Sequence, residues 1–391
     1  MQKQFCVAMV AACPFPTHQG TQVFVRHLAE AQARAGHRVE LISYGYGEAA
    51  QALGFTHHKA VSVNAGLRSG PGFKRVLNDA ALGLKTQRVL GGGDFDVLHV
   101  HNVEGLLIGA ALKAAGMKLP LVYHAHNTMR DELPTYFHRK SVQPVMRWLG
   151  RAFDGSMPRC ADAVIVFDRH HRELQIRRGV RPEKIFVVRP SLDSQELRMT
   201  ESIPVELPES RYLVYSGNPD GYQNLQLLWR AFARVQKSRP GIKLLILTRA
   251  SPQDFGPEAP RGIEKQSVVF RRYATRAELV SYLRRAEVGL STRTISTGFP
   301  VKLINYTQLG LKAVACKESV KAGAFERLWL ADSDPAAFAQ AVLSALDAPA
   351  THPSVASGFE IADTLTAYEN VYDRVLRNKH LTSVNRSARL S

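Results

Sequence analysis

Short apolar runs alternate in the first half of the chain with segments whose apolar residues recur at helical spacing. The apolar runs predict strands at Phe5–Ala12, Val39–Tyr44, Val97–Val100, Leu121–Tyr123 and Val164–Phe167. Helices are predicted between them at Val23–Ala35 and Glu104–Ala115, and Gly36 and Gly116 follow as C-terminal glycines. Strands that alternate with helices of this length indicate a parallel sheet with helices on both faces.

The same pattern restarts near residue 210, which indicates a second α/β domain of similar size. The predicted elements are strands at Tyr212–Tyr215, Lys243–Leu247, Val268–Phe270, Val288–Leu290 and Ala313–Ala315, and helices at Leu225–Val235, Ala277–Arg285, Lys302–Leu309 and Ala362–Leu376. The acidic, proline-containing segment Glu196–Glu209 is predicted to be a linker. The 391 residues therefore divide into an N-terminal domain at 1–195, a C-terminal domain at 210–361, and a terminal helix with a basic tail at 362–391.

The loops that follow the strands are where chemistry is expected, because ligands of open α/β sheets bind at the carboxyl ends of the strands. The first of these loops ends at Gly20 and Thr21, just ahead of a helix. The free N–H groups and the dipole of a helix start suit an anion. An ordinary turn explains that spacing equally well.

Two pairs of histidines follow predicted strands at the same spacing, His99 with His101 and His124 with His126. A metal site is the weaker interpretation, because no nearby cysteine or carboxylate completes a ligand set. A general base or a hydrogen-bonding contact to a substrate is the favoured role for one of these histidines. We therefore predict no metal ligands.

Two loops of the second domain carry further candidates. Gly217, Asn218 and Gln223 lie in a polar loop that, taken alone, matches no functional motif. The other loop leads into the predicted helix at 302, where Gly298 would give a ligand access to the backbone and Pro300 suits a first helical position. The N–H groups around Phe299–Lys302 would face a phosphate, with the charge of Lys302 added. A capped helix with a surface lysine is a credible alternative.

The net charge narrows the classes of partner. The formal charge is +17, from 51 Lys and Arg against 34 Asp and Glu, which favours nucleic acid, an anionic membrane or a phosphorylated substrate. Nucleic acid is the least supported of these, since the basic residues are scattered without interleaved aromatic residues. Four widely separated cysteines are typical of a reduced, cytosolic protein. We expect neither a secretory leader nor a membrane-spanning run.

Taken together, these segments resemble the bacterial glycosyltransferases of the large retaining family 4. The resemblance rests on the order and spacing of Pro14–Pro16, Gly20–Thr21, Ala35–Val39, His124–Asn127, Ala161–Val166, Pro182–Ile185, Tyr215–Asn218, Tyr222–Asn224 and Gly298–Tyr306. It implies an α/β protein of the GT-B fold, in which two doubly wound, Rossmann-like domains face a cleft.

By the family pattern, the first domain binds the acceptor and the second binds a nucleotide-sugar donor. His126 would face the reacting sugar, with His124 as the second candidate. The implied donor contacts are Gly20, Thr21, Gly217, Asn218, Gln223, Arg249, Arg293, Thr297, Gly298, Phe299, Pro300, Val301, Lys302 and Asn305. The nucleotide-sugar, with a UDP-sugar favoured, is a co-substrate, and no metal or other cofactor is implied.

The sequence departs from the family pattern at three of these positions. Thr297 and Asn305 stand where two glutamates are usual, and Gln223 stands where lysine is common. Positive charge for the phosphates would then come from Arg249 and Arg293 together with the lysine of the motif. Loss of activity is not required by these changes, but it stays open.

The implied function is a hexosyl- or N-acetylhexosaminyl-type transferase that acts on a saccharide or lipid-linked acceptor in cell-surface polysaccharide synthesis. A catalytically inactive nucleotide-sugar-binding protein and a nucleotide-sugar epimerase on the same fold are the alternatives. The segment Ser141–Met157 places apolar residues on one helical face with Arg147 and Arg151 nearby. This pattern and the net charge predict peripheral attachment to an anionic membrane from the cytoplasmic side. Packing of the apolar face onto the core is the alternative.

Overall fold

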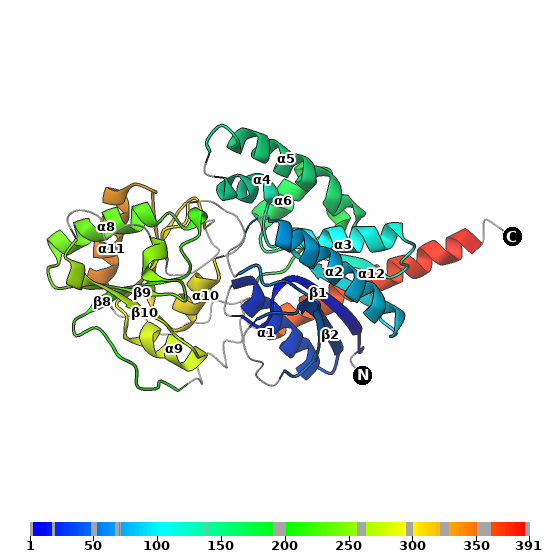
Figure 1. The fold of residues 1–391 in the computed structure, drawn as a ribbon, viewed down its shortest axis with the longest axis horizontal. Coiled ribbons are helices and arrows are strands. Elements are labelled where there is room, and N and C mark those ends of the chain that lie inside the picture. Colours follow the sequence, from blue (N-terminus) through cyan, green and yellow to red (C-terminus); the bar gives the residue numbers. More distant parts are fainter. Residues whose placement is uncertain are drawn as a thin grey trace. The chain divides into compact units, whose positions relative to one another are not determined.

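The computed structural model describes residues 3–17, 20–47, 53–66, 70, 72–137, 139–190, 201–255, 263–294, 300–320, 328–349 and 361–387. The chain forms two compact units, Met1–Ser191 with Ile361–Ser391, and Leu192–Glu360 (Figure 1). The C-terminal helix, treated as a separate element from sequence, thus belongs to the first unit.

The first unit is built on a seven-stranded sheet in the order β3-β2-β1-β4-β5-β6-β7, with every neighbouring pair parallel. Its strands are β1 (Cys6–Pro14), β2 (Arg38–Tyr44), β3 (Thr56–Ala60), β4 (Val97–His101), β5 (Leu121–His124), β6 (Ala163–Val166) and β7 (Ile185–Val187). The strand order reverses between β1 and β4. Doubly wound sheets bind ligands beside such a point, at the carboxyl ends of the strands.

The helices of this unit are α1 (Gly20–Arg34), α2 (Phe73–Gly91), α3 (Asn102–Ala114), α4 (Met129–Glu132), α5 (Gln143–Ser156), α6 (Arg169–Arg177) and α12 (Ile361–Ser387). The unit also contains short 3-10 turns at η1 (Leu133–Tyr136), η2 (Met157–Cys160) and η3 (Pro182–Lys184). After α1, Gly36 adopts a φ of +90°, a conformation that favours glycine and turns the chain into β2. Helix α12 packs against α1, and Gln32 Nε2 donates to the Tyr372 hydroxyl at 2.8 Å.

The second unit repeats the architecture with a six-stranded parallel sheet in the order β10-β9-β8-β11-β12-β13. Its strands are β8 (Tyr212–Ser216), β9 (Lys243–Leu247), β10 (Val268–Arg271), β11 (Val288–Ser291), β12 (Lys312–Cys316) and β13 (Leu328–Ala331). Its helices are α8 (Leu225–Ser238), α9 (Arg276–Arg285), α10 (Val301–Gln308) and α11 (Pro335–Asp347), with 3-10 turns η4 (Gly221–Gln223), η5 (Pro252–Phe255) and η6 (Lys265–Ser267).

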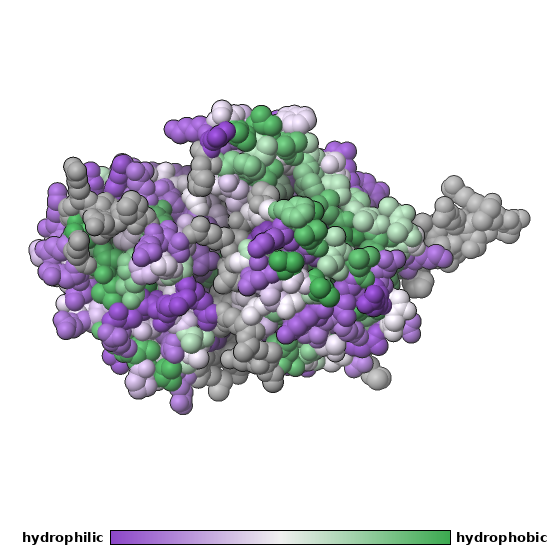
Figure 2. All heavy atoms as spheres, in the orientation of Figure 1, coloured by the Kyte–Doolittle hydropathy of each residue, from purple (hydrophilic) through white to green (hydrophobic). Residues whose placement is uncertain are grey.

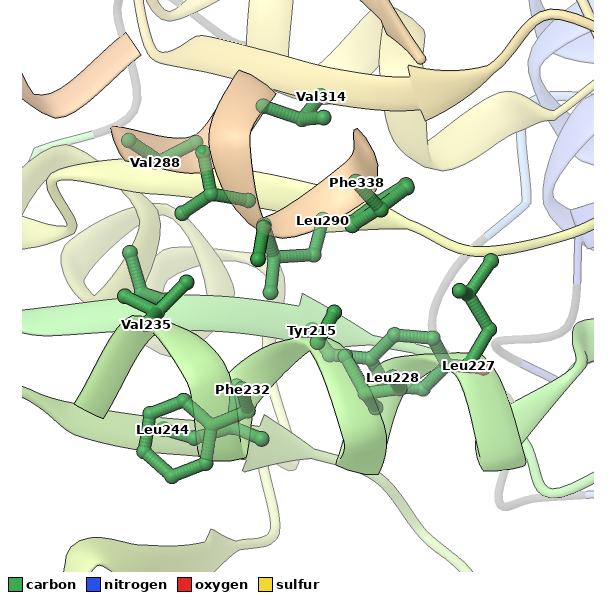
Figure 3. Packing of buried hydrophobic residues seen from close by; sticks show 14 of the residues in the cluster. Tyr215, Leu227, Leu228, Phe232, Val235, Leu244, Val288, Leu290, Val314 and Phe338 are labelled. Carbon is green, nitrogen blue, oxygen red and sulfur yellow. The ribbon is translucent and has the colours of Figure 1, made fainter. Parts of the chain in front are cut away.

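Each unit has its own apolar core. In the second unit, Leu228 and Phe232 of α8 and Phe338 of α11 pack on the face of the sheet that presents Tyr215 and Leu290 (Figure 3). On the opposite face, Leu303 and Tyr306 of α10 join a second cluster. Burial of apolar side chains on both faces fits the near-continuous apolar runs of the strands.

All ten strands predicted from the sequence are present, whereas β3, β7 and β13 were not predicted. These three strands lie at sheet edges and are only partly buried. Only β3 lacks an apolar run, since it reads Thr-His-His-Lys-Ala, whereas β7 and β13 are short apolar runs that were passed over. Helices α2, α4, α6 and α11 were also missed, and α12 continues to Ser387, beyond the predicted end at Leu376. Residues 201–209 of the predicted linker contain no helix or strand, and residues 196–200 lie outside the described part.

Candidate active site

A partly exposed lysine lies at the carboxyl end of β8 in the second unit. The Lys302 ammonium is 4.0 Å from the centroid of the Tyr215 ring and donates to Gln223 Oε1 at 3.1 Å. Gly217 has a φ of +152°, and a Cβ there would come within 2.9 Å of Lys302 Nζ. A side chain at residue 217 would therefore occupy the space beside the ammonium group.

The electrostatics around Lys302 favour an added anion. Loss of water around the ammonium group and the positive charge of Arg293 lower the pKa of Lys302 to about 7, although Asp220 opposes the shift. Within the described part of the chain, no carboxylate forms an ion pair with this lysine. Lys302 also lies in the first turn of α10, where helix N–H groups lack acceptors within the helix.

The neighbouring loop is fixed by contacts within the second unit. The Arg293 guanidinium lies 5.0 Å from the centroid of the Tyr222 ring, and Tyr222 donates to Asp220 at 3.1 Å. Thr292 Oγ1 donates to the carbonyl of Gln223 at 2.9 Å. These contacts orient the arginine and the glutamine that the sequence had singled out.

The structure brings together some of the predicted donor residues and separates others. Gly217, Gln223, Arg293 and Lys302 gather as described, while Asn218 contributes its carbonyl to a 3.1 Å hydrogen bond from the Tyr215 hydroxyl. Arg249 instead donates to the carbonyl of Ala274 at 3.1 Å and lies 5.7 Å from the ring centroid of Tyr273.

The remaining predicted donor residues are placed as follows. Pro300 is the N-cap of α10 and not its first helical residue, which is Val301. Asn305 lies one turn after Lys302 on the same helix and is partly exposed. Gly20 and Thr21 are the first residues of α1 in the first unit. Thr297, Gly298 and Phe299 lie outside the described residues.

The four histidines singled out from the sequence come together in the first unit. His99 and His101 lie on β4, and His101 pairs in register with His124 of β5. His101 Nδ1 is 2.9 Å from His126 Nε2. The side chains are buried among aromatic rings, with Phe24 of α1 edge-on to His124 at 5.2 Å between centroids and Phe167 at 4.9 Å from the same ring.

Burial keeps these histidines neutral. It lowers the pKa of His99 to about 3 and that of His126 to about 3, and it holds the pKa values of His101 and His124 well below 6.5. His124 has no exposed surface in this structure, and its role as the second catalytic candidate stays a prediction. His126 is 4% exposed and stays the candidate.

Partners of this histidine group that the sequence analysis missed come from the last helix. Tyr372 places its hydroxyl 2.8 Å from His99 Nδ1, and Tyr368 places its hydroxyl 3.3 Å from His124 Nδ1. The i, i+4 spacing of the tyrosines puts them on one helix face, but it does not say which surface that face meets. One ring nitrogen from each of His99, His101 and His124 lies within 4.8 Å of the others, so these residues could hold a metal ion.

A second missed group is Glu104, in the first turn of α3 directly after β4. Removal from water raises its pKa to about 7, and Asp79 and Glu132 add to the shift while Arg75 opposes it. A carboxyl group that titrates near neutrality at the carboxyl end of a strand is a candidate for proton transfer. The sequence analysis predicted only that a helix begins at Glu104.

Comparison with known proteins agrees with the two-unit architecture. The model of Glycosyltransferase Family 4 matches residues 18–196, and the model of Glycosyl transferases group 1 matches residues 210–348. The chain is a family 4-like glycosyltransferase. No curated protein sequence gives a significant match to it.

Solved structures share the GT-B fold of this glycosyltransferase. Sucrose-phosphate synthase from Thermosynechococcus elongatus is 16% identical, with 99% of each chain covered and a TM-score of 0.69. A glycosyltransferase from Rickettsia africae is 12% identical over 96% of this chain and 99% of that one, with a TM-score of 0.68. Anabaena HepE in complex with UDP and glucose is 15% identical over 98% and 100%, with a TM-score of 0.61. The predicted fold of two doubly wound domains is confirmed.

Proposed function

We propose that this glycosyltransferase retains anomeric configuration and moves a hexosyl or N-acetylhexosaminyl group from a nucleotide-diphosphate sugar to a saccharide or lipid-linked acceptor in cell-surface polysaccharide synthesis. The observation that carries the proposal is Lys302, which lies at the start of α10 and forms no ion pair with any carboxylate of the described residues. A donor diphosphate supplies the missing negative charge. The similarity to HepE, solved with UDP and glucose, supports a UDP-sugar.

In this proposal the second unit holds the donor and the first unit holds the acceptor. The first N–H groups of α10 and the Lys302 ammonium bind the diphosphate, and the Asn305 amide binds a ribose hydroxyl. His126 contacts the reacting sugar as a neutral imidazole, since its pKa of about 3 keeps it unprotonated. No metal ion is required at the diphosphate, because the positive charge there comes from side chains.

A donor screen tests the binding half of the proposal. UDP-glucose, GDP-mannose and ADP-glucose are each added to the wild type, and the melting temperature is measured, since a bound ligand stabilises the folded state. One donor should raise the melting temperature of the wild type and of Lys317→Met, an exposed lysine in the same unit, but not that of Lys302→Met. Equal shifts in both variants would refute the lysine assignment.

Product analysis tests the chemistry. With the donor identified, the anomeric configuration of the new linkage is read by NMR, and retention of the donor configuration is expected. Binding without transfer to any saccharide or lipid-linked acceptor would favour the inactive binding protein. Conversion of the donor sugar to its epimer in the absence of acceptor would favour the epimerase.

Helix α5 supports the proposed membrane attachment. Val145 and Leu149 of the predicted face are 54% and 42% exposed, and the neighbouring Trp148 is 66% exposed. Packing onto the core holds for another part of the face, since Val142, Met146 and Phe153 are partly buried and Phe153 packs against the core. The buried side of α5 presents Asp154, whose carboxylate accepts hydrogen bonds from the backbone N–H groups of Met129 and Arg130 at 3.0 Å. Val145, Trp148 and Leu149 are therefore the part of the apolar face that is left to solvent.

The exposed apolar surface continues beyond α5. Phe73 and Val76 of α2 are 79% and 63% exposed, and Figure 2 shows apolar side chains gathered over α5, α2 and α3. Lys74, Arg147 and Arg151 are exposed on the same two helices, α2 and α5. Apolar groups flanked by basic ones suit the interface of an anionic membrane. No helix in the described ranges is long and apolar enough to cross a membrane. We therefore propose peripheral attachment at the cytoplasmic face.

A further inference from the structure

Three imidazole rings of the first unit lie together, and each has one nitrogen without a hydrogen-bond partner among the described residues. His99 and His101 are two residues apart on β4, so both project from the same face of the sheet. His124 is the register partner of His101 on β5 and projects from that face too. All three side chains are fully buried, and the Nε2 atom of each has no hydrogen-bond partner among the described residues.

The Nδ1 atom of each ring lies within hydrogen-bond distance of a partner. His99 Nδ1 is 2.8 Å from the Tyr372 hydroxyl, His101 Nδ1 is 2.9 Å from His126 Nε2, and His124 Nδ1 is 3.3 Å from the Tyr368 hydroxyl. Each partner has a lone pair that can accept an N–H. A ring whose Nδ1 carries the hydrogen leaves a lone pair on Nε2, which is how metal-bound histidines are usually oriented.

From these observations we propose that His99, His101 and His124 bind one late first-row transition-metal ion, of the class of Zn²⁺, through their Nε2 atoms. Three unpaired buried nitrogens in one place are unfavourable in the apo protein, and an ion would satisfy all of them at once. The sequence argument against a metal was the lack of a cysteine or carboxylate, but the fold supplies a third histidine from the adjacent strand.

Binding requires the rings to reorient, because their planes lie within 10–32° of one another and the lone pairs of stacked rings do not meet at one point. One ligating nitrogen from each ring lies within 4.8 Å of the other two. Metal–nitrogen bonds of about 2.0–2.1 Å place the nitrogens of a tetrahedral site roughly 3.4 Å apart, so the rings have to rotate out of their stacked arrangement and move closer together. Imidazole ligands select zinc, copper, nickel or cobalt over magnesium or calcium, which prefer oxygen. A water molecule would supply the fourth ligand of the tetrahedral site.

The ion would connect the last helix to the sheet and fix the hydrogen bonding of His126. With His101 Nε2 on the metal, His101 Nδ1–H donates to His126 Nε2, so the proton of His126 resides on Nδ1. His101 is therefore a positioning residue for His126. Tyr368 and Tyr372 of α12 orient two of the ligands, so the bound ion stabilises the packing of α12 on the first unit.

The experiment uses the full chain, purified without a polyhistidine tag and stripped of metal. Zn²⁺ is titrated by calorimetry, and Co²⁺ by visible absorption, which intensifies when the ion is held by nitrogens in a tetrahedral site. We expect one equivalent of each ion per chain and a higher melting temperature with Zn²⁺. Failure of both ions to bind the wild type stoichiometrically would overturn the proposal, whatever the variants do.

Two variants and a control locate the ion. His99→Phe keeps a ring of similar size and should weaken Zn²⁺ binding by ~100-fold or more, whereas Tyr372→Phe, which changes only an orienting partner, should weaken it by ~10-fold. His170→Gln removes an imidazole on α6 outside the group and should leave binding unchanged. If His99→Phe folds and binds as the wild type does, or if His170→Gln alone abolishes binding, the ion lies elsewhere and the proposal is wrong.

Discussion

The affinity of the second unit for a nucleotide-sugar should fall as the pH rises through 7. The free Lys302 has a pKa of about 7, so it is mostly protonated at pH 6 and mostly neutral at pH 8. A bound diphosphate returns the pKa towards the ordinary value near 10.4, because an adjacent anion favours the ammonium form. Binding is therefore accompanied by proton uptake, and uptake becomes more unfavourable as the pH rises.

The size of the effect follows from the fraction of Lys302 that is protonated before binding. About 90% of the free lysine is protonated at pH 6 and about 10% at pH 8, for a pKa of about 7. The dissociation constant should then rise by ~10-fold between these values, which is ~1.4 kcal/mol. A nucleotide-sugar is the appropriate probe, because it has no terminal phosphate that titrates in this range, unlike a free nucleoside diphosphate.

Calorimetry measures both quantities. Titration of the cognate nucleotide-sugar in buffers of different ionisation enthalpy gives the protons taken up, which should be close to one per site at pH 8 and close to zero at pH 6. Lys302→Arg stays charged throughout and should bind without this pH dependence. Lys302→Met should bind ~10–150-fold more weakly at pH 6, from the ~1.5–3 kcal/mol of a hydrogen bond to a charged group. A wild type whose affinity is flat from pH 6 to pH 8 would refute the reasoning.

Three further predictions concern catalysis, metal dependence and membranes. His126→Ala should cut turnover by ~10²-fold, the scale of a positioned polar group, and near-normal turnover of a folded variant would remove His126 from the site. EDTA should leave nucleotide-sugar binding unchanged in calorimetry, and a loss restored by Mg²⁺ or Mn²⁺ would show that the diphosphate site holds a cation. Trp148→Asp should weaken flotation with anionic liposomes at low salt by ~10-fold, while Ile203→Asp, an exposed apolar residue of the second unit, should not. Equal binding to neutral and anionic liposomes would contradict the attachment.

Most of the fold could be predicted from the sequence because buried parallel strands are nearly continuous apolar runs. Cys6–Pro14 and Lys243–Leu247 are of this kind, and both were found, the first as Phe5–Ala12. The edge strand Thr56–Ala60 reads Thr-His-His-Lys-Ala, and its side chains are mostly half-exposed or exposed. Nothing in such a sequence distinguishes a strand from a loop, since its pairing with β2 depends on the backbone of a neighbour.

The candidate sites were predictable only in part, because their partners come from distant segments. The position of Lys302 after a strand suggested a phosphate contact, but its low pKa depends on Arg293 and on the burial that the fold imposes. The two histidine pairs were visible as separate motifs. The two pairs come together because β4 pairs with β5 in the sheet. Tyr372, which contacts His99, lies 273 residues further along the chain.

Asn305 lies one turn after Lys302 on α10 and carries no charge, so replacing it with an acid tests the role of Lys302 directly. Residues three apart on a helix face one another, so Asn305→Glu places a carboxylate beside the ammonium group. An opposite charge at that distance raises a lysine pKa by one unit or more, to about 8. The change in nucleotide-sugar affinity from pH 6 to pH 8 should then shrink from ~10-fold to ~2-fold, even though the added charge weakens binding overall. Thr307→Glu, on a different face of α10, should keep the ~10-fold dependence. If Asn305→Glu keeps it as well, the proton that titrates with binding does not belong to Lys302.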